Sequence, residues 1–203
     1  MVQFSTQELD IASEPITLLI KNRVMEKMSE LFGEAEARTM DLIEEQLPVL
    51  PLKLNLTNGK ISKGENYKFL PYMILDYPAF FSKTDVFALR SMFYWGNFYS
   101  FTFHLKGEYL ASYGESALKH LSGVKDVYFC VNSTEWEYLY SDYNYKLLSE
   151  VSSAEIENQI KENQFIKLSV KYPVEELHDF IPRLETFLRS FISVCKQLPA
   201  DSG

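Results

Sequence analysis

One stretch decides the fold of this chain: Met92-Phe-Tyr-Trp-Gly-Asn-Phe-Tyr-Ser-Phe-Thr-Phe-His104. The central Gly-Asn is typical of a hairpin turn, and the aromatic residues on both sides favour strands. Aromatic residues continue upstream, so that fourteen of them lie between Tyr67 and Phe103. Because aromatic side chains at strand spacing first of all build a core, this stretch predicts a sheet and does not by itself indicate a function.

The turn also predicts the register of the hairpin. A two-residue turn at Gly96-Asn97 pairs Trp95 with Phe98 and fixes every pair further along the two strands. In that register Arg90 and His104 point to opposite sides of the sheet. The two side chains are therefore not expected to share a cavity.

Periodicity predicts the other elements. A first helix follows Ser13-Glu14-Pro15, a cap residue and an early proline, with one apolar stripe made of Ile16, Ile20, Val24, Met28, Leu31 and Ala35. Gly33 is a candidate break, and a second helical piece carries Met40, Ile43 and Leu47. Further helices are expected over 108–121, 153–163 and about 174–198, where Pro182 either kinks the last helix or marks its start near Phe180.

Strands are expected over 52–57, 69–76, 86–95, 98–105, 124–131, 136–140 and 165–172, with a turn at Asn58-Gly59. This order predicts an α+β fold, in which a mainly antiparallel sheet with the aromatic hairpin is covered on one face by the N-terminal and C-terminal helices. Neither a repeat nor a linker-like stretch divides the chain, so residues 1–203 are expected to form a single domain.

Composition narrows the class of protein. The chain has 203 residues, 46% of them hydrophobic, which excludes a disordered chain. A chain of this length buries roughly 70% of its unfolded surface and needs neither disulfides nor a structural metal. Cys130 and Cys195 both lie in apolar runs, so we expect reduced core thiols and a cytoplasmic protein.

Charge and hydropathy restrict the partners. The net charge is -8, with acidic residues concentrated between 30 and 45, and such a chain repels the phosphate backbone of nucleic acid. The start of the chain does not have the pattern of a signal peptide, and no run approaches the roughly 20 apolar residues of a membrane span. Nucleic acid and membrane are therefore not expected as partners.

Signatures of catalysis or metal binding are absent from the sequence. None of the three histidines has a second histidine or cysteine at metal-ligand spacing, so we expect no metal site. A Gly-x-Ser-x-Gly elbow, a phosphate-binding loop and a Cys-x-x-Cys pair are also missing, and no cofactor is expected. A triad assembled from distant residues stays open.

A positive strip is the first candidate site. Residues 53–68 contain four lysines and a single acid, Glu65; the lysines are Lys53, Lys60, Lys63 and Lys68. The expected loop 63–66 could bind a small anion. The alternative is an edge strand whose lysines prevent pairing with another molecule.

Arg90 and His104 are the second candidate site, because both lie in apolar surroundings. A buried guanidinium needs a partner, so Arg90 is paired with an acid, exposed on the open face of the sheet or reserved for a ligand; Asp76 and Asp85 are the nearest acids. His104 is either a hydrogen-bonded structural residue or a base.

Aromatic residues also indicate self-association. Residues 136–145 are rich in amphipathic aromatic side chains, which are common at protein interfaces: Trp136, Tyr138, Tyr140, Tyr143 and Tyr145. These residues predict a homodimer.

The order of elements has a counterpart among known families. The chain resembles the YktB-like family of bacterial proteins over residues 67–110 and 164–198. The resemblance rests on Tyr67-Lys68-Phe69-Leu70-Pro71, which leads into aromatic strands, and on the closing strand and the long amphipathic helix. The resemblance implies a mixed helix and sheet fold. It supplies no catalytic residue, because that family is itself uncharacterised.

Two hypotheses for function follow. The first is a non-enzymatic ligand-binding or protein-interaction module, because surplus aromatic residues are evident and catalytic constellations are not. The second is an enzyme acting on a small anionic substrate, in which Arg90 and the lysines Lys60 and Lys63 hold the anion and His104 moves a proton.

Overall fold

The computed structural model describes residues 1–46 and 58–196. These residues form the helices α1 (Thr6–Ser13), α2 (Ile16–Gln46), α3 (Glu108–Leu121), α4 (Ser153–Asn163) and α5 (Phe180–Cys195), with the 3-10 helices η1 (Leu148–Glu150) and η2 (Val174–Asp179). The strands are β1 (Lys60–Tyr67), β2 (Leu70–Phe81), β3 (Val86–Tyr94), β4 (Phe98–Lys106), β5 (Tyr128–Cys130), β6 (Tyr145–Leu147) and β7 (Phe165–Pro173). None of the helices in these ranges is long and apolar enough to cross a membrane.

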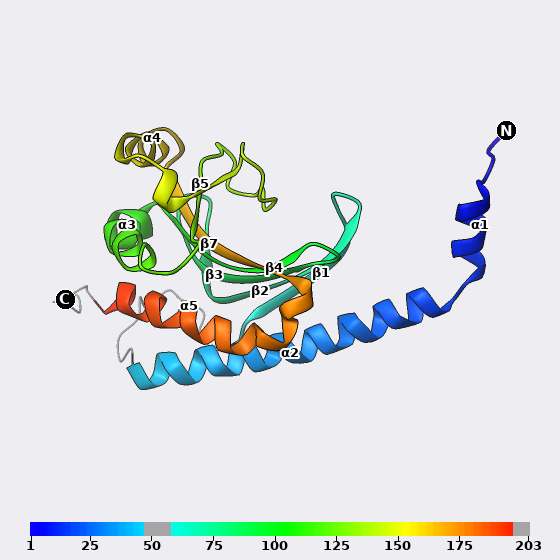
Figure 1. Cartoon of the computed structure of the whole chain (residues 1–203). Coiled ribbons are helices and arrows are strands. Elements are labelled where there is room, and N and C mark those ends of the chain that lie inside the picture. The colour runs from blue at the N-terminus through cyan, green and yellow to red at the C-terminus, as the bar shows by residue number, and fades with distance from the viewer. Residues whose placement is uncertain (47–57, 197–203) are drawn as a thin grey trace.

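The strands form one sheet in the order β1-β2-β3-β4-β7-β5-β6, and every pair of neighbours in the described residues is antiparallel. Helices α2 and α5 cover one face of this curved sheet (Figure 1). The α+β fold predicted from the sequence, with an antiparallel sheet covered by the N-terminal and C-terminal helices, is confirmed.

The register predicted for the aromatic hairpin is wrong by one residue. Tyr94 pairs with Phe98, because the amide of Asn97 bonds the carbonyl of Tyr94 at 3.1 Å and Gly96 has a φ of 66°. A positive φ suits glycine at the third position of a type II turn. The amide of Trp95 bonds the carbonyl of Pro71 in β2 at 3.0 Å and so is not free to pair across the hairpin.

This shift changes which side chains share a face. Arg90 lies opposite Thr102, and His104 follows two residues later on the same strand. Residues two apart on a strand point to the same side. Arg90 and His104 therefore lie on the same face of the sheet, contrary to the prediction.

The helix-covered face is the main apolar core. Phe180 of α5 contacts the rings of Phe32, Tyr99 and Phe101, and it joins α2, α5 and β4. Leu188 is fully buried, as the stripe of the last helix predicted. That helix begins at Phe180 after the 3-10 turn η2, so the start near Phe180 is the correct alternative for Pro182.

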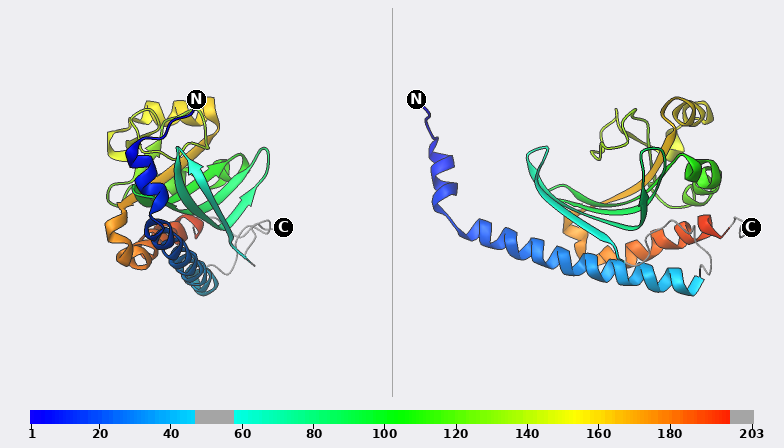
Figure 2. Two further views of the ribbon diagram at one scale, coloured as in Figure 1. Left: turned by 90° about the vertical axis from the view of Figure 1, so that its right-hand side faces the viewer. Right: turned by 180° about the vertical axis from the view of Figure 1, so that it is seen from behind.

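Helix α2 is continuous through Gly33, so the predicted break does not occur. Its buried residues begin at Met25 and include Met28 and Ala35, but Ile16 and Ile20 are 60% and 45% exposed. The first turns of α2 and the whole of α1 extend beyond the sheet (Figures 1 and 2). The predicted stripe therefore reaches the core from Val24 onward, and Ile16 and Ile20 lie outside it.

The opposite face of the sheet is covered by residues 131–144, here called the cover segment. The strand predicted over 136–140 is wrong, because this part of the cover segment has no regular secondary structure. Cys130 and Cys195 are buried free thiols, as predicted. The strand predicted over 52–57 lies outside the described residues, as does Leu47.

Candidate functional site

Arg90 is buried beneath the cover segment and forms an ion pair. Asp76 lies opposite it on β2, and the guanidinium Nε and Nη2 donate to the two carboxylate oxygens at 2.6 and 2.8 Å. The hydroxyl of Tyr138 accepts a hydrogen bond from Nη1, and the ring of Tyr138 lies 4.9 Å from the cation. Burial opposes the charge, but Asp76 outweighs it and raises the pKa of Arg90. Arg90 therefore has the acidic partner that its apolar surroundings required.

His104 lies on the same face and contacts Glu135 of the cover segment. The imidazole Nε2 is 3.2 Å from one oxygen of Glu135, and Nζ of Lys106 is 2.8 Å from the other. Burial lowers the pKa of His104 to about 4, while the nearby imidazole of His104 and the hydrogen bond from Lys106 lower the pKa of Glu135 to about 2. At neutral pH a neutral imidazole thus faces an ionised carboxylate.

Lys167 is the third buried basic residue on this face, after Arg90 and His104, and was not identified from the sequence. It lies opposite His104 on β7, is 1% exposed and donates from Nζ to the carbonyl of Glu137 at 2.7 Å. Nζ also lies 5.1 Å from the ring centroids of Tyr138 and Tyr145, and burial lowers the pKa of Lys167 to about 8. A lysine inside the apolar run of β7 is the signal that could have identified it.

The cover segment is tied to the hairpin β1–β2 as well. The carboxylate of Glu137 accepts from the hydroxyl of Tyr67 and lies 3.0 Å from Nζ of Lys68. Tyr140 packs over β4 and β7, where its hydroxyl meets the hydroxyl of Ser169. Arg90, His104 and Lys167 thus all contact the cover segment. The polar residues on this face of the sheet therefore hold a segment of the same chain.

The structure places only Lys60, and not Lys63, on the face of the sheet that carries this cluster, because Lys60 pairs with Asp76. Both side chains are exposed on β1, an edge strand of the described sheet, and residues 63–66 belong to that strand and do not form a loop. Lys60 lies opposite Asp76 and Lys63 opposite Met73, so the two lysines point to opposite faces. This placement fits the alternative in which lysines protect a sheet edge.

The predicted aromatic interface is largely internal. Tyr145 is buried, and Tyr138 and Tyr140 pack on the sheet within one subunit. Only Trp136 and Tyr143 of the five predicted residues are exposed. The aromatic density of this region therefore mainly serves the cover segment, and it does not form a continuous free surface.

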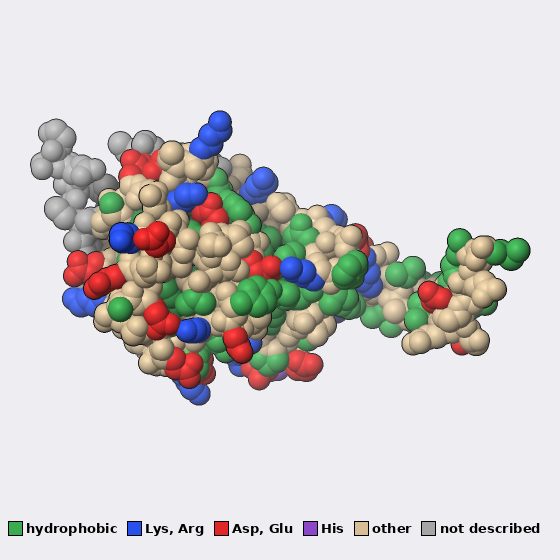
Figure 3. Space-filling model, turned by 90° about the horizontal axis from the view of Figure 1, so that it is seen from above, with side chains coloured by type: hydrophobic (Ala, Val, Ile, Leu, Met, Phe, Trp, Pro, Cys, Tyr) green, Lys and Arg blue, Asp and Glu red, His purple; other side chains and the backbone are tan. Residues whose placement is uncertain are grey.

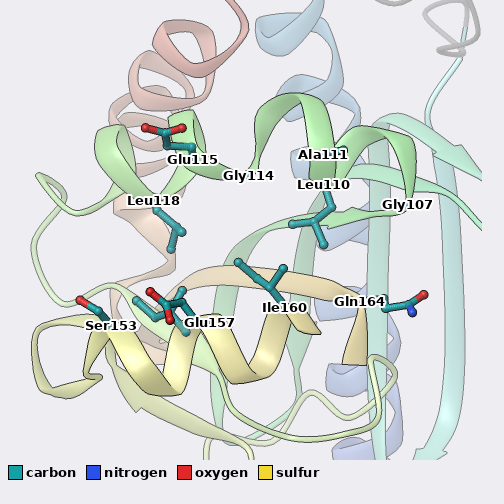
Figure 4. Close-up of a pocket in the computed structure, with 11 residues that line it drawn as sticks. Gly107, Leu110, Ala111, Gly114, Glu115, Leu118, Ser153, Glu157, Ile160 and Gln164 are labelled. Carbon is teal, nitrogen blue, oxygen red and sulfur yellow. The ribbon is translucent and has the colours of Figure 1, made fainter. Parts of the chain in front are cut away.

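A groove lies between α3 and α4, on the outside of the molecule (Figure 4). It has a volume of about 780 Å³, and its apolar lining consists of half-buried aliphatic side chains from both helices: Leu110, Leu118, Ile156 and Ile160. Gly114 also lines the groove, and a Cβ at this position would lie 2.9 Å from Leu110 Cδ1. The sequence predicted both helices but not the space between them.

The charge at this groove is acidic. Glu115 of α3 and Glu157 of α4 line the groove and are exposed, so each wall carries a carboxylate. Lysine and arginine are absent from its described lining. The groove therefore combines an apolar interior with an acidic rim.

A second, smaller pocket of about 470 Å³ contains Lys171. Nζ of Lys171 lies 4.9 and 5.2 Å from the ring centroids of Tyr140 and Tyr128. No carboxylate within the described ranges forms an ion pair with it, and burial lowers its pKa. Asn97, Ser141 and Tyr172 complete the polar lining.

Residues 1–46 and 58–196 contain no group of three histidine, cysteine, aspartate or glutamate side chains able to hold a metal ion. Comparisons of the chain with protein-family models, curated proteins and solved structures find no match. The resemblance to the YktB-like family stays a prediction.

Proposed function

We propose that this protein is a non-enzymatic interaction module that binds an amphipathic helix of a partner protein in the α3–α4 groove. The observation that carries the proposal is the apolar groove with a carboxylate on each wall. A helix seated between two helices buries apolar side chains at three- and four-residue spacing and presents its polar edges to the rim. Because the rim holds Glu115 and Glu157, the partner helix is expected to carry lysine or arginine at its edges.

The polar cluster under the cover segment supports this assignment indirectly. Arg90 would hold a substrate anion in the enzyme hypothesis, but its guanidinium is already bound by Asp76. A guanidinium with both partner oxygens at hydrogen-bond distance has little left to offer an anion. The groove, in contrast, is open to solvent and has unpartnered apolar walls.

A synthetic helical peptide built from leucine and lysine tests the proposal. We expect it to bind the protein in a fluorescence anisotropy titration, with an affinity that falls as salt is added. Ala111→Trp places a large ring in the groove from an exposed position and should weaken binding at least about tenfold, equivalent to about 1.4 kcal/mol. Glu115→Lys with Glu157→Lys should weaken it further.

The matched control is Ser112→Trp, which adds the same ring at an exposed position of α3 outside the groove. It should leave the peptide affinity unchanged. Equal affinities for Ala111→Trp and Ser112→Trp would show that the peptide only senses the net charge of the protein. Equal binding of a leucine and glutamate peptide would also contradict the acidic rim as the determinant.

The Lys171 pocket favours a second candidate function, the binding of a small anion. Lys171 is exposed at this pocket, lies between tyrosine rings and has no carboxylate partner in the described residues, so its ammonium group can meet an anion, and the aromatic lining suits an aromatic carboxylate. Calorimetric titration with benzoate should give saturable binding that is lost in Lys171→Met and kept in the exposed control Lys125→Met. Identical heats for benzoate and benzyl alcohol would show that the charge of Lys171 is not used.

A further inference from the structure

The N-terminal arm, defined as residues 1–24, carries more exposed apolar surface than any function above explains. Leu9 and Ile11 of α1 are exposed, and so are four residues of the first turns of α2: Ile16, Leu18, Leu19 and Ile20. Figure 3 shows apolar side chains along this part of the molecule where it leaves the body. No residue of α1 is buried.

An arm of this kind needs a cover to be stable. A helix as short as α1 is marginal in water when it packs on nothing. In α2, Leu18 continues the face that carries Met25 one heptad later, while Ile16 and Ile20 lie on the opposite side. A helix that is apolar on all sides is normally buried, so another molecule is expected to cover the arm.

The distribution of charge identifies the kind of cover. Residues 1–20 contain the acids Glu8, Asp10 and Glu14 and neither lysine nor arginine, whereas residues 21–27 contain the three bases Lys21, Arg23 and Lys27 and one acid, Glu26. An acidic helix is a poor ligand for the anionic surface of a membrane. The order acid, apolar, base is complementary to itself when two copies run antiparallel.

We propose that two copies of this chain form a homodimer through their arms, which pair antiparallel about a two-fold axis near Leu18 and Leu19. In this arrangement the apolar runs cover each other, and Glu14 of each copy lies opposite Arg23 of the other. A two-fold contact uses the same patch on both subunits, so a self-complementary segment is what it requires. This interface differs from the one predicted from the tyrosines of the cover segment.

The base of the arm contributes further apolar surface. Lys21 forms an ion pair with Glu65 near the end of β1, so the arm leaves the body beside the hairpin β1–β2. Phe69 at the turn of that hairpin is 91% exposed. In the antiparallel dimer, α1 of each copy extends toward this end of the other copy, where Phe69 is available for contact.

Sedimentation equilibrium on the full chain at micromolar concentration tests the dimer. We expect twice the monomer mass of 23.6 kDa for the wild type and the monomer mass for Leu19→Asp. The control Ala37→Asp adds the same charge at an exposed position of α2 outside the arm and should stay dimeric. Because Leu19 is exposed within one copy, circular dichroism should show that Leu19→Asp remains folded.

Charge reversal and a distance measurement test the orientation. Arg23→Glu should raise the dissociation constant of the dimer about tenfold, since it converts two attractive pairs into repulsive ones. Spin labels attached through Lys27→Cys should be about 26 Å apart along an antiparallel pair, because each lies 8.5 residues from the axis at about 1.5 Å per residue. Parallel arms would hold the labels at about the 10 Å spacing of packed helices.

Three results would overturn the proposal. A monomer mass for the wild type would exclude the dimer, and a dimer that survives Leu19→Asp would place the interface elsewhere. A monomer that sediments with vesicles of phosphatidylcholine and phosphatidylserine would assign the arm to a membrane surface. None of these results depends on peptide binding by the α3–α4 groove.

Discussion

Removing Arg90 should strongly destabilise the fold, because the substitution leaves a buried carboxylate without its partner. In Arg90→Met the apolar stem keeps most of its packing, but Asp76, which is 7% exposed, loses two hydrogen bonds of 2.6 and 2.8 Å. Breaking a buried ion pair from one side costs about 3–5 kcal/mol. For a chain of this length that loss lowers the melting temperature by about 6–20 °C.

The assay is urea unfolding of the wild type, Arg90→Met and the double variant Asp76→Leu with Arg90→Met. The double variant removes both charges and should recover most of the loss, since replacing a whole buried pair by apolar residues is often neutral or stabilising. Lys63→Met, an exposed cation on β1, is the control and should change the free energy of unfolding by less than about 0.5 kcal/mol. Equal midpoints for Arg90→Met and Lys63→Met would refute the reasoning and leave Arg90 free for a ligand.

Three further predictions concern the core, the pH dependence and a helix start. Leu188→Ala should cost about 2–5 kcal/mol in urea unfolding because Leu188 is fully buried, whereas Glu185→Ala on the same helix should stay within about 0.5 kcal/mol. Stability should fall as the pH drops from 6.5 toward 4, because the pKa of His104 is about 4 when folded and 6.5 when unfolded, so the unfolded chain binds the proton first. His104→Gln should flatten that slope in unfolding midpoints taken across the same range, and an unchanged slope would assign it to other groups. Ser152→Ala removes the capping box of α4 and should lower the free energy of unfolding by about 1 kcal/mol, measured by thermal unfolding. An unchanged melting temperature would show that water replaces the cap without loss.

Local periodicity was sufficient for the elements that repeat one simple pattern. Helices α3 and α4 have the predicted bounds, and β3, β4 and β7 agree with prediction within one residue at each end. Their patterns depend on neighbours three, four or two positions away, which are all present in the sequence. The acid at Asp76 was likewise among the expected partners of Arg90.

The short acidic N-terminal helix, the edge strand β1 and the start of β5 were not predicted correctly. Apolar and polar residues alternate only weakly in β1. This strand forms because it pairs with β2, where Lys60 lies opposite Asp76. In the cover segment, alternating aromatic residues favour a strand, but their side chains instead fill a polar sheet face. Propensity for a strand gives no information about whether a neighbouring strand has a free edge.

Short-range spacing was sufficient to predict the class of the fold, the presence of the aromatic hairpin and the apolar stripe of the last helix. The register of the hairpin depends on a contact with another strand, since the amide of Trp95 donates to the carbonyl of Pro71 in β2. The burial of Lys167 and the exposure of Ile16 and Ile20 depend on tertiary contacts in the same way. Whether an apolar or charged side chain is buried depends on which residues pack against it, and those residues are far away in the sequence.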